Sequence, residues 1–134
     1  MKKNLYITII TFILLSILET IINQLFLKSS YNALQTVWRP NEELIANAPI
    51  FFLIYGVFAV SFSYLFNKAY NKTGIVEGIT IGLAIGLMAK FWYGYTNYIV
   101  LPIPNALAFQ WFFYGTIECM IIGAAAALVA DKTE

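Results

Sequence analysis

Long apolar segments separated by short polar ones dominate the pattern of this chain. Four such segments lie at residues 5–27, 49–66, 74–100 and 105–130. An α-helix needs about 20 mostly apolar residues to cross the hydrocarbon core of a bilayer, and each segment approaches or exceeds this length. None of them alternates apolar and polar residues as a barrel strand does. Lipid offers no partner to unpaired backbone groups, so the pattern predicts four transmembrane α-helices.

The connections between these segments differ in length and character. Residues 67–73 form a short polar turn, and Pro102 and Pro104 mark a tight turn between the last two segments. The longer outer connection, 28–48, carries apolar residues three and four apart, which fits a short helix lying in the membrane interface. These residues are Tyr31, Leu34, Val37 and Trp38. We therefore predict one all-α domain over residues 1–134, folded as an antiparallel four-helix bundle.

The first segment also has features of a cleaved signal peptide. Lys2 and Lys3 precede its apolar run, as in such peptides. The run is too long, however, and the residues after Phe26 do not form a small-x-small cleavage site. We therefore expect a permanent helix.

The distribution of Lys and Arg predicts the orientation of the chain. Five of these residues fall on one side of the predicted bundle and two on the other, and the more basic side of a membrane protein usually faces the cytoplasm. The bias places both termini in the cytoplasm and argues against insertion in two opposite orientations. The five are Lys2, Lys3, Lys68, Lys72 and Lys132, and the two are Lys28 and Arg39.

Composition narrows the classes of function. Only 11% of residues are charged and 60% are hydrophobic, whereas a soluble domain has about 25% charged residues. With no His and one Cys, a zinc site, a histidine-ligated haem and a disulfide framework are not expected. A net charge of +1 provides no electrostatic footprint for nucleic acid. We expect no metal and no cofactor.

Small residues recur every four positions in the last two segments, which places them on one face of each helix. Because these segments follow one another through a tight turn, we favour packing of the two small-residue faces against each other. Self-association of two copies through the same faces is the alternative. The residues are Gly78, Gly82 and Gly86 in one segment, and Gly115, Cys119 and Gly123 in the other.

Five polar residues fall inside the predicted spans, where a charge at the helix centre costs about 2.5–3.5 kcal/mol on insertion scales. Such groups usually face the protein interior and have partners there. The topology places them in the outer half or near the midplane, so we expect an intramembrane polar cluster. Its members are Glu19, Asn23, Lys90, Gln110 and Glu118.

The cluster has two interpretations. It is either a set of interhelical bonds that fixes which helices touch, or a site that senses protons or binds a cation. Two carboxylates and one lysine leave an acid without an obvious partner. Arg39, next to Trp38 at the outer mouth, either reaches lipid headgroups or supplies a countercharge for Glu19.

Three short motifs support a resemblance. Trp38-Arg39-Pro40, Glu77-Gly78 at the start of a Gly-rich span, and Pro102-Ile103-Pro104 resemble those of small four-span bacterial inner-membrane proteins of the domain-of-unknown-function type. The resemblance covers nearly the whole chain. It implies a four-helix bundle in a bacterial inner membrane, and it carries no established activity.

The chain contains none of the common catalytic motifs: no H-E-x-x-H, no G-x-S-x-G, no Cys-x-x-Cys and no Gly-rich phosphate loop. We therefore expect a non-enzymatic membrane protein that acts as a binding or accessory module, either as a subunit of a complex or for a lipid-like ligand. The alternative is a small oligomeric transporter or channel that couples to protons or cations through Glu19, Glu118 and Lys90. The expected partners are the lipid bilayer and other membrane subunits or further copies of this chain.

Overall fold

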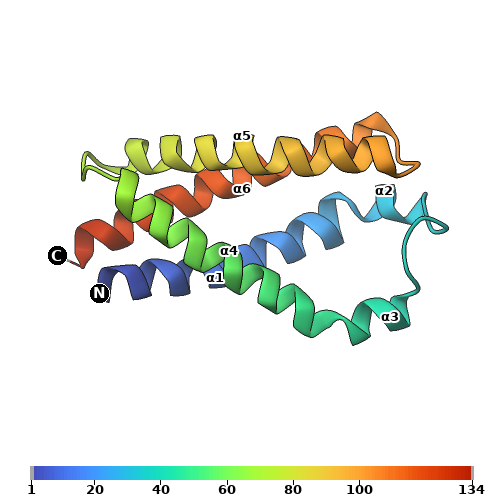
Figure 1. Cartoon of the computed structure of the whole chain (residues 1–134), viewed down its shortest axis with the longest axis horizontal. Coiled ribbons are helices and arrows are strands. Elements are labelled where there is room, and N and C mark those ends of the chain that lie inside the picture. Colours follow the sequence, from blue (N-terminus) through green and yellow to red (C-terminus); the bar gives the residue numbers. More distant parts are fainter. Residues whose placement is uncertain (1, 134) are drawn as a thin grey trace.

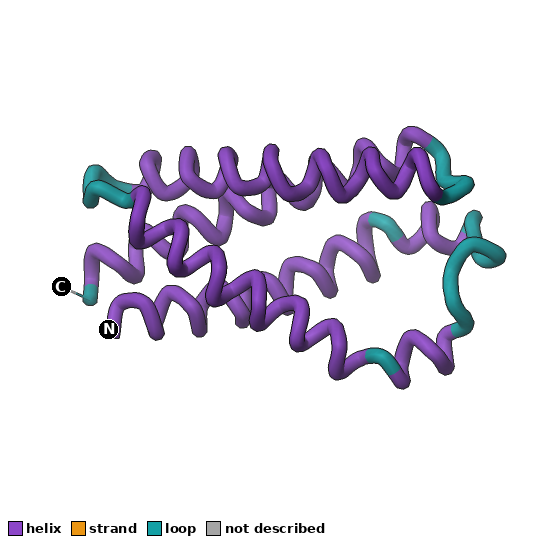
Figure 2. The backbone as a smooth tube through the Cα atoms, in the orientation of Figure 1, coloured by secondary structure: helices purple, strands orange, loops and turns teal. Residues whose placement is uncertain are grey.

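Helices make up nearly all of the regular structure in the computed structural model, which describes residues 2–133 (Figures 1 and 2). Within these residues there is no strand, and four helices are long and apolar enough to cross a membrane. The all-helical fold and the four long helices predicted from the apolar pattern are confirmed. The elements are α1 (Lys2–Ile21), η1 (Ile22–Phe26), α2 (Lys28–Asn32), α3 (Asn41–Ala46), α4 (Ala48–Ala69), α5 (Ile75–Val100) and α6 (Asn105–Lys132).

The long helices extend beyond the apolar segments at several ends. The first begins at Lys2 and the last ends at Lys132, whereas the apolar pattern begins at residue 5 and ends at residue 130. The second continues to Ala69 instead of residue 66. Polar side chains do not interrupt the backbone hydrogen bonds of a helix, so hydropathy marks the apolar length rather than the helix end.

A wider π-helical turn, η1, continues α1 into the outer connection. Its signature is the hydrogen bond from the backbone N–H of Leu27 to the carbonyl of Ile22, with an N···O distance of 2.9 Å. Such turns insert an extra residue into a helix and often lie at functional sites. Here the turn contains Asn23, one of the predicted polar residues.

The outer connection does not form the interfacial helix predicted through residues 31–38. Helix α2 ends at Asn32, residues 33–37 form turns, and a second short helix, α3, begins after Pro40. After Asn32 the backbone bonds are those of i+3 turns, from Leu34 N–H to the Tyr31 carbonyl at 3.1 Å and from Val37 N–H to the Leu34 carbonyl at 2.9 Å. The indole N–H of Trp38 also donates to the Tyr31 carbonyl, at 3.0 Å, and so ties the turn to α2.

Helices α5 and α6 pack closely along their small residues. A Cβ added at Gly82 would collide with the carbonyl oxygen of Cys119, and one added at Gly78 would collide with that of Gly123. Gly86 lies against Thr116, where an added Cβ would be 2.9 Å from the Thr116 Cα. The two predicted small-residue faces are therefore brought together within one chain.

Helix α4 packs against α1 but makes few contacts with α5 or α6. It crosses α1 and diverges from α5 toward α3 (Figure 1). Its one glycine, Gly56, has nothing within 4 Å of an added Cβ, so this glycine takes part in no close approach, and α4 meets α1 through the buried Ala59 and Ser63. The four long helices therefore do not all pack against one another, because α4 and α5 make little contact.

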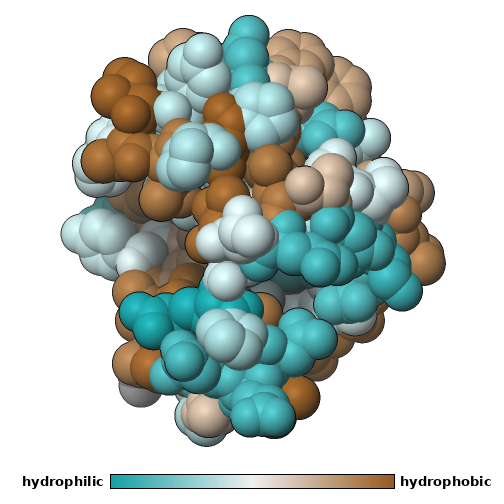
Figure 3. Space-filling model, turned by 90° about the vertical axis from the view of Figure 1, so that its right-hand side faces the viewer, coloured by the Kyte–Doolittle hydropathy of each residue, from teal (hydrophilic) through white to brown (hydrophobic). Residues whose placement is uncertain are grey.

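The four long helices meet most closely at the end that holds the start of α1 and the end of α6 (Figure 1). Phe62, Phe66 and Tyr70 form a column of stacked rings there, with centroids 6.1 and 4.8 Å apart. Ile7 of α1 and Ile122 of α6 belong to the same buried core. At the opposite end the surface is mixed, and hydrophilic residues gather over its lower half, toward α3 (Figure 3).

Candidate functional site

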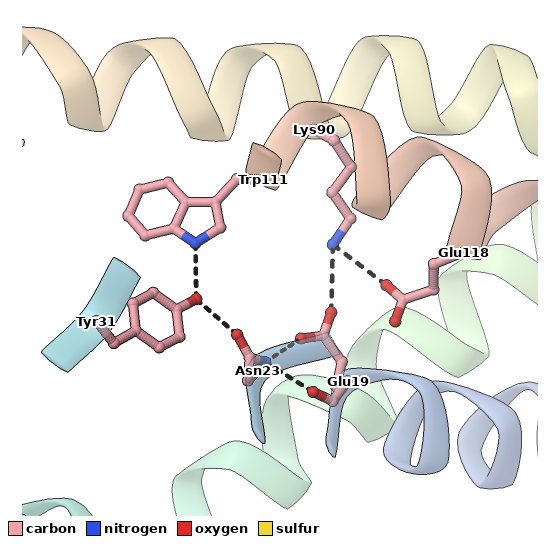
Figure 4. A network of polar contacts seen from close by, with 6 residues as sticks. All are labelled: Glu19, Asn23, Tyr31, Lys90, Trp111 and Glu118. Carbon is pink, nitrogen blue, oxygen red and sulfur yellow. Dashed lines mark hydrogen bonds and ion pairs between the residues drawn. The ribbon is translucent and has the colours of Figure 1, made fainter. Parts of the chain in front are cut away.

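Lys90 lies between two carboxylates from two other helices. Its Nζ is 3.8 Å from Oε1 of Glu19 on α1 and 3.8 Å from Oε1 of Glu118 on α6 (Figure 4). These distances are those of ion pairs and exceed the 2.7–3.2 Å typical of N–H···O hydrogen bonds. The structure therefore joins three of the five predicted polar residues around a single cation.

Gly115 supports the position of Lys90. A Cβ added at this glycine would lie 2.7 Å from both Cγ and Cδ of the lysine. The aliphatic part of Lys90 therefore lies across the surface of α6 where that helix has no side chain. We predicted Gly115 as part of a helix-packing face, and it instead accommodates a side chain that reaches toward α1.

Glu118 is the most buried member of the site, with a side-chain exposure of 0%. Neither of its carboxylate oxygens has a hydrogen-bond partner among residues 2–133. Buried carboxylates are normally hydrogen-bonded, because desolvation without a partner is costly. Glu118 is thus an exception that requires a physical explanation.

Glu19 is held differently. Its Oε2 accepts a hydrogen bond from Nδ2 of Asn23 at 2.9 Å, and the same amide nitrogen donates to the backbone carbonyl of Glu19 at 2.8 Å. The π-helical turn places the Asn23 amide group where it contacts both the carboxylate Oε2 and the backbone carbonyl oxygen of Glu19. The side chain of Glu19 is 22% exposed, in contrast to that of Glu118.

Two further residues, Tyr31 on α2 and Trp111 on α6, extend this network beyond Asn23 (Figure 4). The Tyr31 hydroxyl donates to Oδ1 of Asn23 at 2.6 Å and accepts from the indole N–H of Trp111 at 2.8 Å. Burial raises the pKa of Tyr31 to about 12, so the hydroxyl keeps its proton at neutral pH. The chain of donors therefore runs from Trp111 through Tyr31 and Asn23 to Glu19.

The sequence did not predict either residue as part of the cluster. It placed Tyr31 in an interfacial helix and gave no role to Trp111. No spacing signal joins them, because they are 80 residues apart and meet only through the fold of the outer connection.

Gln110 does not join the cluster as predicted. Its Oε1 accepts a hydrogen bond from the Ser30 hydroxyl at 3.2 Å. It lies eight residues before Glu118 on the same helix, about 12 Å along the axis, and its hydrogen bond joins it to Ser30 rather than to the carboxylates. Gln110 instead ties α2 to α6.

Arg39 is not a countercharge for Glu19, so that alternative is wrong. Its Nη1 lies 3.1 Å from Oε2 of Glu43, and its side chain is 72% exposed. The two residues are four apart around the start of α3, which makes this local pair easier to form than a distant one. The neighbouring ring of Trp38 packs on Tyr31 and Trp111, with centroid distances of 5.4 and 6.2 Å.

A lateral groove of about 410 Å³ opens between α4 and α5, and Lys90 is one of its lining residues. The Lys90 ammonium is 5.9 Å from the centre of the Phe58 ring, within cation–π range. Most of the lining is apolar or aromatic, with a few polar groups. The other lining residues are Phe58, Ala89, Trp92, Tyr93, Thr96 and Asn97.

Within residues 2–133, no cluster of acidic and cysteine side chains is suited to hold a metal ion. Comparison with protein families, with characterised proteins and with solved structures gives no match to this chain. The geometry of the chain itself is therefore what supports the proposals that follow.

Proposed function

We propose that the chain is a multi-pass protein of a bacterial inner membrane, with its four long helices antiparallel and both termini in the cytoplasm. The excess of Lys in the terminal segments and in the 67–73 turn supports this orientation. The exposed apolar side chains along α4 and α5 support a lipid environment, because water would solvate them poorly. They include Leu53, Val57 and Val60 on α4, and Met88 and Trp92 on α5.

Within that membrane, the chain acts as a non-enzymatic binding module for a lipid-like ligand. The observation that carries this proposal is the lateral groove between α4 and α5. It faces the region where acyl chains would lie, since the two helices diverge there (Figure 1). Phe58 and Trp92 provide apolar contact area for a hydrocarbon tail.

A polar group on the ligand has a defined place to bind. Lys90, Thr96 and Asn97 lie on the same side of the groove, on α5. Ligand sites commonly combine an apolar lining with a few polar groups that fix orientation, and this groove has that composition. An amphiphile would thus place its tail along α4 and its head toward Lys90.

The test is native mass spectrometry of the protein released from lipid, using a variant that fills the groove. Ala89→Phe puts a ring into the groove, whereas Ala84→Phe makes the same change on an exposed position of α5 outside it. We expect the wild type and Ala84→Phe to retain a bound lipid-like molecule and Ala89→Phe to lose it. A monomer that carries no ligand and no partner in any of the three would contradict the proposal.

An accessory role within a larger complex is the other form of this function. It would appear in the same experiment as a protein subunit that co-purifies in defined stoichiometry. In that case the groove is expected to be covered by the partner, and Ala89→Phe would release the subunit rather than a lipid.

A second function is supported by a separate observation, the sharing of one ammonium by two carboxylates. An intramembrane group of this kind suits a small oligomeric transporter or channel that couples to protons or cations. Because four helices enclose little space, such a pore would form between subunits. Flux measured in liposomes should fall in Glu19→Gln and Glu118→Gln, and unchanged flux in both would count against coupling through these residues.

A further inference from the structure

The three ionisable side chains at the site do not balance in charge. Lys90 contributes one positive charge, and Glu19 and Glu118 contribute two negative ones if both are ionised. Within residues 2–133, the polar contacts of the site include no second cation. A surplus negative charge away from water is unfavourable unless a proton or cation neutralises it.

The direction of the hydrogen bonds distinguishes the two carboxyl groups. An indole N–H can only donate, so the bond from Trp111 makes the Tyr31 oxygen an acceptor and directs the Tyr31 proton toward Asn23. Asn23 accepts that proton with its Oδ1, so its Nδ2 is the group that donates to Glu19. This chain of donors ends on Glu19 and stabilises it as a carboxylate.

Glu118 receives no such support. Its side chain is fully buried and its oxygens accept no hydrogen bond within the described part of the chain. The ionisable groups around it are Lys90 of α5, Glu19 of α1, Tyr55 of α4 and Cys119 of its own helix. Of these, Lys90 alone is a cation, and Glu19 already shares it.

We infer that Glu118 is a proton-binding site and that Glu19 is the permanent counter-ion of Lys90. A proton on Glu118 removes the surplus charge and leaves one ion pair, Glu19–Lys90, which the donor chain from Trp111 reinforces. The inference deepens the second function above, because it names the group that would carry the coupled proton.

Exposure indicates how the proton reaches the site. The side chains of Lys90 and Glu19 are 21% and 22% exposed, whereas that of Glu118 is inaccessible. Lys90 also lines the lateral groove. Exchange of the Glu118 proton therefore passes beside Lys90 or beside Glu19, and a ligand in the groove should slow the route beside Lys90.

Infrared spectroscopy of the protein in lipid tests this assignment through the C=O band of a protonated carboxyl group. At neutral pH we expect one such band in the wild type, at the high frequency of a weakly hydrogen-bonded acid. Glu118→Asp should shift this band, because the carbonyl stretch of an aspartic acid differs from that of a glutamic acid. The matched change Glu19→Asp should leave it in place.

The reverse assignment, in which Glu19→Asp shifts the band and Glu118→Asp does not, would overturn the inference. So would the absence of any protonated carboxyl band at neutral pH, particularly if sodium then raised the melting temperature, since a cation would hold the site instead. These spectra do not depend on transport, so a protein without flux activity but with the expected band disproves the second function and leaves the proton site intact.

Thermal unfolding provides a second measurement in case an Asp variant does not fold. Gln resembles a protonated Glu in shape and charge, so Glu118→Gln should keep the wild-type melting temperature. Glu19→Gln removes the counter-ion of Lys90 and should lower it. Equal losses in both variants would contradict the division of roles.

Discussion

At the scale of single residues, one hydroxyl group, that of Tyr31, links the connection between α1 and α4 to the site around Lys90. Tyr31 accepts from Trp111 and donates to Asn23, so one oxygen satisfies polar groups from α6 and η1. Removing it would leave two partly buried groups without partners. An unsatisfied buried donor or acceptor costs about 1–3 kcal/mol.

Tyr31→Phe should therefore lower the free energy of unfolding by about 1–3 kcal/mol, with the loss traceable to Asn23 and Trp111. The matched control is Tyr98→Phe, because Tyr98 is an exposed tyrosine at the outer end of α5. Denaturant unfolding of both variants in the same detergent measures the difference. Equal stability of Tyr31→Phe and Tyr98→Phe would show that the hydrogen-bonded chain contributes little.

The raised pKa of Tyr31 adds a dependence on pH. Burial raises this pKa from about 10 to about 12, so the folded state retains a proton that the unfolded chain releases first. Stability from this group is present below pH 10 and is lost as pH rises toward about 12. Between pH 10 and 12, the free energy of unfolding should therefore fall more steeply with pH in the wild type than in Tyr31→Phe. Parallel curves for the two proteins would contradict the burial of this hydroxyl.

At the scale of elements, the contact between α5 and α6 depends on backbone-to-backbone approach. Gly82 faces the carbonyl of Cys119 with no room for a methyl group, whereas Gly56 on α4 has open space around it. The four-residue spacing of small residues was enough to predict this pairing of helices. It did not predict that Gly115 accommodates Lys90, because spacing shows a small face but not what occupies it.

Gly82→Ala should separate α5 from α6 and destabilise the protein by about 1–3 kcal/mol, as other overpacked substitutions do. Gly56→Ala makes the same chemical change without a collision and should be neutral or slightly stabilising, since Ala favours helix over Gly. Thermal unfolding of the two variants provides the comparison. A neutral Gly82→Ala would contradict the close packing of the two helices.

The elements that sequence did not predict are marked by local changes in the hydrogen-bond pattern. After Asn32 the i+4 bonds give way to i+3 bonds, and η1 contains the i+5 bond from Leu27 to Ile22. Neither leaves a periodic pattern of apolar residues. With η1 counted as the continuation of α1, hydropathy thus predicted the long helices to within three residues at each end, but it did not predict η1 or the structure between the first two spans.

At the scale of the whole molecule, the apolar segments determine the number of long helices, and the few charged residues determine which groups meet between them. Three of the five predicted polar residues meet around one point, because a charged group on each of α1, α5 and α6 has few alternatives within lipid. Asn23 joins them through its bond to Glu19, and Gln110 alone of the five bonds elsewhere, to Ser30. Arg39, the proposed countercharge, is exposed and pairs with Glu43 instead. The divergence of α4 could not be predicted, as it depends on which faces fit together in three dimensions.

The central claim is that lipid solvates the outside of these helices while the two ends of the molecule lie on opposite sides of a membrane. Cysteine labelling tests it directly in a Cys119→Ala background, using a membrane-impermeant reagent on intact cells and on inverted vesicles. We predict that Asn71→Cys reacts only from the cytoplasmic side, Asn105→Cys only from the other side, and the apolar mid-span Leu87→Cys from neither. Reaction of the first two from the same side, or of Leu87→Cys from water, would contradict the account.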